Sequence, residues 1–171
     1  EVWSTAVAVP HGRTELQRIV DVDAEPVISR GILYAASYQG QLVAVSLQDG
    51  RVLWKRDMST YAGIAVDDTQ VLVTDADSDV WAVERSTGRS LWKQSELRRR
   101  ALTGPAVIAE YVAVGDFEGY LHLLMRSDGS VAGRVRVDSD GIQATPVTVF
   151  GDRLLVLGAG GKLVLYQLAA L

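Results

Sequence analysis

Short apolar or alternating stretches, separated by turn residues, run along the whole chain. Residues 32–37, 41–47 and 52–55 are rich in Val, Ile, Leu and Ala, and glycine-bearing turns separate them. A period of two that is interrupted in this way is typical of β-strands joined by hairpins. No stretch shows a sustained helical period with capping residues. The pattern therefore predicts an almost entirely antiparallel β protein with little helix.

One arrangement of strands and turns recurs about every 40 residues, which is the repeat length of four-stranded propeller blades. The first turn position recurs at Gly40, Ser78, Gly119 and Gly161. A second turn position recurs in step with it at Gly50, Gly88 and Gly129. The Asp-Gly and Thr-Gly pairs at the second position suit tight hairpins, because glycine adopts φ > 0 without steric cost. The repeat predicts an all-β propeller of four-stranded antiparallel blades.

Proline marks the start of three of these units. Pro26, Pro105 and Pro146 each precede small and β-branched residues, and proline is tolerated at the first residue of a strand. The expected division is 1–9 as the last strand of a preceding blade, 10–25 as an inter-blade loop, 26–61, 62–103 and 104–144 as blades, and 145–171 as an incomplete last blade. These segments hold about four blades' worth of strands, as expected for a piece of a longer propeller.

Both ends of this division leave a strand edge unpaired, and unpaired edges attract further strands. The strand expected at residues 1–9 could complete the last blade, either within one chain or between two copies. We expect the exchange between two copies, which makes a homodimer.

A spacing of alanine, glycine and tryptophan occurs twice, in register with the repeat. Its two copies are Ala44, Gly50, Trp54 and Ala82, Gly88, Trp92. The alanine leaves room, the glycine turns the chain, and the tryptophan covers the gap between neighbouring blades, where it buries on the order of 200 Å². The third unit has Leu123 at the alanine position and Gly133 at the tryptophan position, so docking there should be weaker. This spacing resembles the tryptophan-docking motif of quinoprotein-type (PQQ-like) propeller repeats.

Composition excludes several classes of function. The chain has 171 residues, of which 48% are hydrophobic, and its net charge is −4, so it lacks the basic footprint of a nucleic-acid partner. With no cysteine and two histidines, neither a disulfide framework nor a thiolate nucleophile is available. Arg98, Arg99 and Arg100 are interpreted as a solvated loop. Apolar runs fall far short of the ~20 residues that span a bilayer, so the chain itself is expected to be soluble.

Three stretches imitate known sites without completing them. Residues 75–79 resemble the start of a calcium loop, but Val80 and Ser86 stand where that loop needs glycine and glutamate. Residues 158–162 resemble a phosphate-binding loop, but a strand follows them in place of a helix. His11 and His122 have no nucleophile motif beside them. The sequence therefore predicts no catalytic residue, no metal site and no cofactor.

The stretch from His11 to Pro26 is too long for a routine blade connection, and over-long loops are often functional. It carries the pattern G-x-T-E-x-x-R-x-x-D-V-D, formed by Gly12, Thr14, Glu15, Arg18, Asp21, Val22 and Asp23. This pattern resembles the inter-blade loop of the BamB family, the lipoproteins of the bacterial outer-membrane β-barrel assembly machine. Further matches are Trp54-Lys55-Arg56 and Gly115-Asp116, so the resemblance covers nearly the whole chain.

The resemblance implies an eight-bladed propeller, tethered by a lipid to the periplasmic face of the outer membrane. Its expected function is a non-catalytic scaffold that binds the periplasmic domains of BamA and assists insertion of β-barrel proteins, with other assembly subunits and unfolded outer-membrane proteins as further partners. The family pattern places Asp21 and Asp23 in the partner-binding site. We count Arg18 and Glu15 with this site and expect them to hold the shape of the loop. Two alternatives remain open at this point: a fragment of a quinone-dependent dehydrogenase, and a generic protein-interaction propeller.

Overall fold

The computed structural model describes residues 1–7, 24–37, 40–60 and 62–168, and these residues form four antiparallel β-sheets. The first blade consists of β1 (Val27–Ser29), β2 (Ile32–Ala36), β3 (Gln41–Ser46) and β4 (Val52–Asp57). The second consists of β5 (Ile64–Val66), β6 (Gln70–Thr74), β7 (Val80–Glu84) and β8 (Ser90–Gln94). The third consists of β9 (Ala106–Ile108), β10 (Tyr111–Gly115), β11 (Tyr120–Met125) and β12 (Val131–Arg136). The last consists of β13 (Val147–Val149), β14 (Arg153–Leu157) and β15 (Leu163–Gln167).

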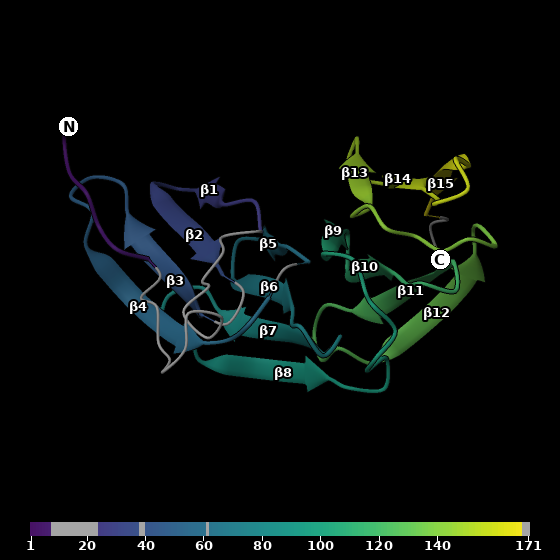
Figure 1. Ribbon diagram of the computed structural model, residues 1–171, viewed down its shortest axis with the longest axis horizontal. Helices are drawn as coiled ribbons and strands as arrows, with labels where there is room; N and C mark the ends of the chain where they lie inside the picture. Colours follow the sequence, from purple (N-terminus) through teal and green to yellow (C-terminus); the bar gives the residue numbers. More distant parts are fainter. Residues whose placement is uncertain (8–23, 38–39, 61, 169–171) are drawn as a thin grey trace, which may run out of the picture.

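The four sheets follow one another around an arc, which opens toward the top of Figure 1. Within each sheet, every strand pairs with its neighbour in the sequence, so each blade is a simple antiparallel meander. The short first strands of successive blades contact one another, β1 with β5, β5 with β9, and β9 with β13. They form the inner wall of the arc, and β4, β8 and β12 lie outermost. The expectation of an all-β propeller-type fold is confirmed.

The hydrophobic core lies between the blades, because each sheet has two apolar faces. Tyr34 and Leu42 of the first blade pack with Val71 and Val73 of the second in one cluster. Equivalent clusters lie between the second and third blades and between the third and last blades. A blade of this kind cannot bury its faces alone, so stability depends on contacts between neighbouring repeats.

Three tryptophans dock on the blade that follows them by the same two contacts. The indole N–H of Trp3, Trp54 and Trp92 donates to a backbone carbonyl of the following blade, each at 2.9 Å, and the acceptors are Leu47, Arg85 and Arg126. The indole ring also covers a glycine three residues beyond the acceptor, and these glycines are Gly50, Gly88 and Gly129. Each glycine thus turns its own chain and receives the ring of the preceding blade, a second role that the spacing within one repeat did not reveal.

Only glycine fits at these turns, as Gly88 illustrates. A Cβ atom there would lie 2.6 Å from Cε3 of Trp54, and its φ is +72°. The short distance leaves no room for a side chain, and the positive φ is strained for any residue other than glycine. The closeness of the ring to the backbone is what seals the gap between the first two blades.

The third blade follows the same register without the tryptophan. Ala44 faces Trp54 across β3 and β4, and in the same position of the third blade Leu123 faces Gly133. A register shift follows Ala44 and Leu123 alike, so the backbone irregularity is retained although the ring is absent. Among the described residues, no heavy atom outside its chain neighbours lies within 4 Å of a Cβ placed on Gly133, so the space at this tryptophan position is open.

The junction between the third and last blades uses other contacts instead. Thr148 donates its hydroxyl to the carbonyl of Val107 at 2.6 Å, and the carboxylate of Asp138 accepts from the N–H of Gly160 at 3.1 Å. A buried apolar cluster that includes Ile142 and Leu154 supports them.

The N-terminal residues differ from the expected strand. Residues 1–7 form no strand, and residues 8 and 9 lie outside the described residues. Trp3 nevertheless occupies the same place against Gly50 that Trp54 occupies against Gly88. With Val7 it packs on the outward face of the first blade, over Ala35, Val43 and Val45. Docking of the indole at this end therefore does not require a paired strand.

We expect replacement of Trp54 by alanine to lower the free energy of unfolding by roughly 3–5 kcal/mol, because it removes a buried aromatic ring and leaves a cavity between two blades. Urea denaturation followed by circular dichroism measures the change. Leu91→Ala is the control, because that side chain is 45% exposed on β8 and should change stability little. A loss below about 1 kcal/mol for Trp54→Ala would contradict a docking role.

Candidate functional site

The residues predicted to bind a partner lie just before the first blade. Asp21, Asp23, Arg18 and Glu15 are outside the described residues. The next described residue, Ala24, is 2% exposed and belongs to the cluster between the first two blades. Ala24 therefore anchors the point at which this segment joins β1.

That anchor lies at one particular face of the arc. Because the strands of a blade alternate in direction, the β2–β3 type of hairpin and the blade-to-blade connections emerge at the same edge of each sheet. We call this edge the hairpin face; its described segments are 24–26, 40, 58–60, 62–63, 75–79, 95–105, 116–119, 137–146 and 158–162. The segment that carries the predicted partner-binding residues thus joins the structure at the hairpin face.

Two aspartates hold the hairpins of the second and third blades in the same way. Asp75 accepts from the indole N–H of Trp81 at 2.8 Å and from the N–H of Asp79 at 2.9 Å. Asp116 lies 2.7 Å from Nε2 of His122 and accepts from the N–H of Tyr120 at 2.9 Å. In both hairpins one carboxylate therefore bonds to a ring on the third strand and to the backbone of the turn. The signal in the sequence was their shared position, three residues before Ser78 and Gly119, and it was missed.

The basic run Arg98–Arg100 lies in a loop in which Arg98 and Arg99 are exposed, as expected, but Arg98 and Arg100 also form ion pairs that link these hairpins. Arg98 donates to both oxygens of Asp79, at 3.1 and 2.5 Å, within the second blade. Arg100 donates to Asp116 at 2.6 Å and to Glu118 at 2.5 Å in the third blade. The run therefore ties two blades together at the hairpin face, and the side chains of Asp79 and Asp116 are almost completely buried.

The charges in this clasp stabilise one another. Burial disfavours the ionised form of Asp116, but hydrogen bonds from His122, from the Tyr120 N–H and from Arg100 outweigh it, and the pKa of Asp116 lies below its ordinary value. The pKa of Asp79 is lowered against burial in the same way by Arg98 and Lys93. A lowered folded-state pKa means that the ionised carboxylate contributes stability above about pH 4, and that this stability is lost as the pH falls through the folded-state pKa.

The hydrogen bonds of His122 differ from those of a histidine in a hydrolytic triad. Since an ionised carboxylate can only accept, the N–H of His122 Nε2 is the donor of the hydrogen bond to Asp116. The other ring nitrogen, Nδ1, is buried and has no hydrogen-bond partner among the described residues. A hydrolytic triad places a nucleophile's hydroxyl at that second nitrogen. The described part of the chain also places no group of three or more His, Cys, Asp or Glu side chains where they could hold a metal ion.

The hairpin face is hollowed and partly apolar. A recess of about 310 Å³ is lined by Phe117, Asp140 and Gln143, with Leu102 and Ile142 on its floor. Phe117 is 53% exposed at the tip of its hairpin. Exposed aromatic and acidic groups around a shallow recess suit the binding of another protein, since aromatic residues dominate such contacts.

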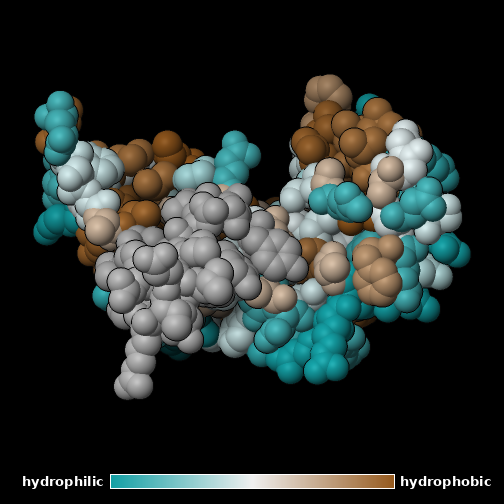
Figure 2. Space-filling view, in the orientation of Figure 1, coloured by the Kyte–Doolittle hydropathy of each residue, from teal (hydrophilic) through white to brown (hydrophobic). Residues whose placement is uncertain are grey.

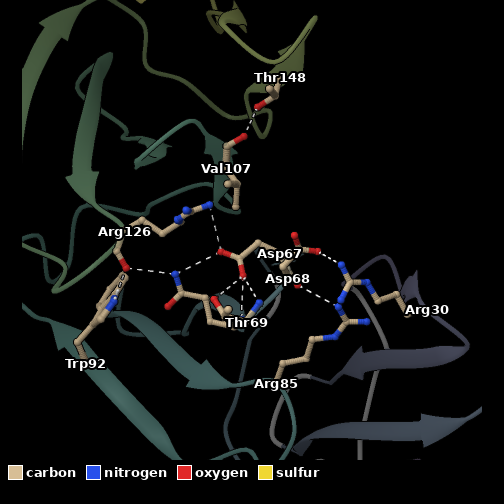
Figure 3. A network of polar contacts seen from close by, with 10 residues as sticks. Arg30, Asp67, Asp68, Thr69, Arg85, Trp92, Val107, Arg126 and Thr148 are labelled. Atoms are coloured by element: carbon tan, nitrogen blue, oxygen red, sulfur yellow. Dashed lines mark hydrogen bonds and ion pairs between the residues drawn. The ribbon is translucent and has the colours of Figure 1, made fainter. Parts of the chain in front are cut away.

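The opposite face carries polar links between blades (Figure 3). Arg30 pairs with Asp68 across the first two blades, and Asp67 lies 3.6 Å from Arg126 of the third. Gln70 donates to the carbonyl of Arg126 at 3.1 Å, which is the same carbonyl that the docked indole of the second blade uses. The turns on this face thus bond to the turns of neighbouring blades, and these bonds reinforce the tryptophan contacts.

Comparison with known proteins identifies relatives along nearly the whole chain. The family model of outer membrane protein assembly factor BamB matches residues 1–94. BamB of Pseudomonas aeruginosa is 44% identical over 98% of this chain and 44% of its own length. BamB of Shewanella oneidensis is 42% identical over 97% of this chain and 42% of its own length. The chain thus spans less than half the length of these curated relatives.

Solved structures give the same match. The crystal structure of BamB from Moraxella catarrhalis superposes with a TM-score of 0.88 at 32% identity, over 98% of this chain and 49% of that one. The designed protein Ika4 matches with a TM-score of 0.76 at 15% identity, over 98% of this chain and all of its own. Quinohemoprotein alcohol dehydrogenase of Comamonas testosteroni matches with a TM-score of 0.65 at 17% identity, over 86% of this chain and 35% of its own. The last two likenesses concern the fold alone.

We expect Asp116→Asn to lower the free energy of unfolding by about 2–3 kcal/mol at pH 7, because Arg100 and His122 lose a charged acceptor. The difference from the parent protein should shrink as the pH falls from about 4 through the lowered folded-state pKa of Asp116, because the unfolded chain takes up the proton first and the folded carboxylate only at lower pH. Urea denaturation between pH 3 and 8 measures both. Asp128→Asn, in an exposed turn on the opposite face, should have a smaller effect. A difference that does not depend on pH would contradict the ionic role of Asp116.

Proposed function

The chain belongs to the family of outer membrane protein assembly factor BamB, and from this premise we propose that it is a non-catalytic scaffold for the assembly of outer-membrane β-barrel proteins. The observation that carries the proposal is the 44% identity to an assembly factor across 98% of the chain. In this role the propeller binds the periplasmic domains of BamA, and it works at the periplasmic face of the outer membrane in a lipid-anchored protein. Other subunits of the machine and unfolded barrel proteins are further partners of the same scaffold.

The geometry of the hairpin face supports a binding role. Its hairpins are held by buried carboxylates and clasped by Arg98 and Arg100, so little ordering is required when a partner binds. A rigid surface of this kind gains affinity because it does not lose conformational freedom on association.

The proposed contact site with BamA includes Asp21 and Asp23. Their segment joins the structure at Ala24, which is anchored at the hairpin face. Residues two apart project to the same side of an extended backbone, so this spacing can present both carboxylates together. A partner that offers two basic groups would be recognised by such a pair. Arg18 and Glu15 have the supporting role of holding the loop.

The described residues include no helix long and apolar enough to cross a membrane. The proposed attachment to the outer membrane is through a lipid, as the family resemblance implies.

A redox enzyme is the alternative that the fold itself raises. Quinohemoprotein alcohol dehydrogenases share this propeller at 17% identity, a level at which only the fold is common. The relatives above 30% identity are named as assembly factors. We therefore favour binding over catalysis.

We expect the double change Asp21→Ala and Asp23→Ala to weaken binding to the periplasmic domains of BamA at least tenfold, because charge pairs at an interface raise affinity and association rate. The unfolding free energy should stay nearly unchanged. Biolayer interferometry at low and at physiological salt measures the dissociation constant and both rates. The matched control, Asp49→Ala with Asp128→Ala, removes the same charge from the turns of the opposite face. Equal affinities for the two double variants would contradict the assignment of the site.

A further inference from the structure

The recess beside Phe117 on the hairpin face combines an apolar floor with two different groups at its edge. Leu102 and Ile142 form the floor and are almost completely buried. Phe117 and Asp140 also line the recess, and both are exposed. No lysine or arginine is among the described residues that line it. We call this hollow the Phe117 recess.

The repeat itself does not require an aromatic ring at residue 117. When the hairpins are aligned, the second and last blades have Ala76 and Ala159 at this position. The first blade has Tyr38, which lies outside the described residues. Because alanine suffices to form the hairpin in the two neighbouring blades, we attribute the ring of Phe117 to binding, in which aromatic side chains are enriched.

The turn that carries Phe117 is held in place before any partner binds. The carboxylate of Asp116 accepts from the N–H groups of Glu118 and Tyr120, at 3.0 and 2.9 Å. The N–H of Phe117 donates to the carbonyl of Arg100 at 3.1 Å. The guanidinium of Arg100 lies 5.8 Å from the centre of the Phe117 ring, and its ion pairs with Asp116 and Glu118 balance its charge. Such a fixed turn loses little conformational freedom on association.

The carboxylate of Asp140 is available to a ligand. It forms no ion pair with another described residue, and its hydrogen bond there is a long one of 3.3 Å from the hydroxyl of Ser139. The carboxylate of Asp138 instead accepts from the N–H groups of Asp140 and Gly160, each at 3.1 Å. These bonds, above all the one from Asp140, hold the pKa of Asp138 below its ordinary value. Asp138 thus stabilises the loop, and Asp140 is left for binding.

The hairpin face is the more acidic of the two faces. Its described segments carry nine acidic and four basic side chains. The turns of the opposite face carry six acidic and five basic side chains; these turns are 30–31, 47–51, 67–69, 85–89, 109–110, 126–130 and 150–152. Figure 2 shows hydrophilic residues gathered along the lower rim, over the end of β8 and the connection that follows it. A partner with basic groups is therefore attracted to the hairpin face.

We propose that the Phe117 recess binds a lysine or arginine side chain of a protein that docks on the hairpin face. The methylene stem of that side chain lies on Leu102 and Ile142, since long basic side chains cover apolar surface with their stems. Its charged head meets the carboxylate of Asp140 and the ring of Phe117, because the face of an aromatic ring attracts a cation. The inference rests on the proposed function only in taking the ligand from a protein.

Nuclear magnetic resonance of protein with ¹³C-labelled phenylalanine rings tests the proposal, because the chain contains two phenylalanines. Phe150, which is 86% exposed in a turn of the opposite face, is the internal control. Its ring also has an arginine, Arg153, at 5.8 Å. Capped Gly-Arg-Gly and Gly-Lys-Gly peptides are the probes, and peptides with citrulline or norleucine are their uncharged counterparts. We expect the basic peptides to shift the Phe117 signals saturably in the millimolar range, the uncharged ones to bind more weakly, and the Phe150 signals to stay unchanged.

The double change Phe117→Leu with Asp140→Asn should weaken binding of the basic peptides about tenfold, because it removes the ring and the charge. Saturation transfer from the protein to the peptide measures binding, and the circular dichroism spectrum should stay unchanged. The matched control, Phe150→Leu with Asp152→Asn, makes the same replacements in a turn of the opposite face and should bind like the parent protein.

Equal binding of the charged and uncharged peptides would overturn the proposal, as would equal shifts of the Phe117 and Phe150 signals or equal affinities of the two double variants. The peptides do not involve BamA. A recess that fails this test therefore leaves the proposed function standing, and a failure to bind BamA leaves the result for the recess standing.

Discussion

The docking of a tryptophan onto the glycine turn of the following blade is the contact on which the rest of the structure depends. Each blade is a small meander with two apolar faces, and on its own it would leave both in water. The indole closes a junction by three effects at one position: it buries a large ring, it satisfies a backbone carbonyl, and it fills the space that a glycine leaves. Where Gly133 replaces the ring, a hydroxyl-to-carbonyl bond and an aliphatic cluster hold the junction instead. Stability therefore accumulates junction by junction, as in other repeat proteins.

Charge has a different function from docking in this molecule. At the hairpin face, Arg98 and Arg100 reach two nearly buried carboxylates in successive blades, and each carboxylate also fixes the turn that carries it. Buried ion pairs of this kind contribute less to net stability than to a single, well-defined arrangement, because desolvation offsets much of their attraction. The effect suits the proposed scaffold, since it gives the hairpin face a fixed shape. The propeller fold is shared with redox enzymes, so the fold alone does not determine the function.

Most of the fold could be predicted from the sequence, because a propeller repeat has a pattern of turns and strands that can be recognised within about 40 residues. The glycine and proline positions, the strand alternation and the substitution at Leu123 and Gly133 all lie within one repeat. Contacts between repeats left no comparable signal. The spacing within one repeat could not show that Trp54 docks on Gly88, 34 residues further on, and Arg100 reaches Asp116 across a blade boundary. From the sequence alone, a run of three arginines is expected to be solvated, because the sequence does not show which carboxylates pair with it.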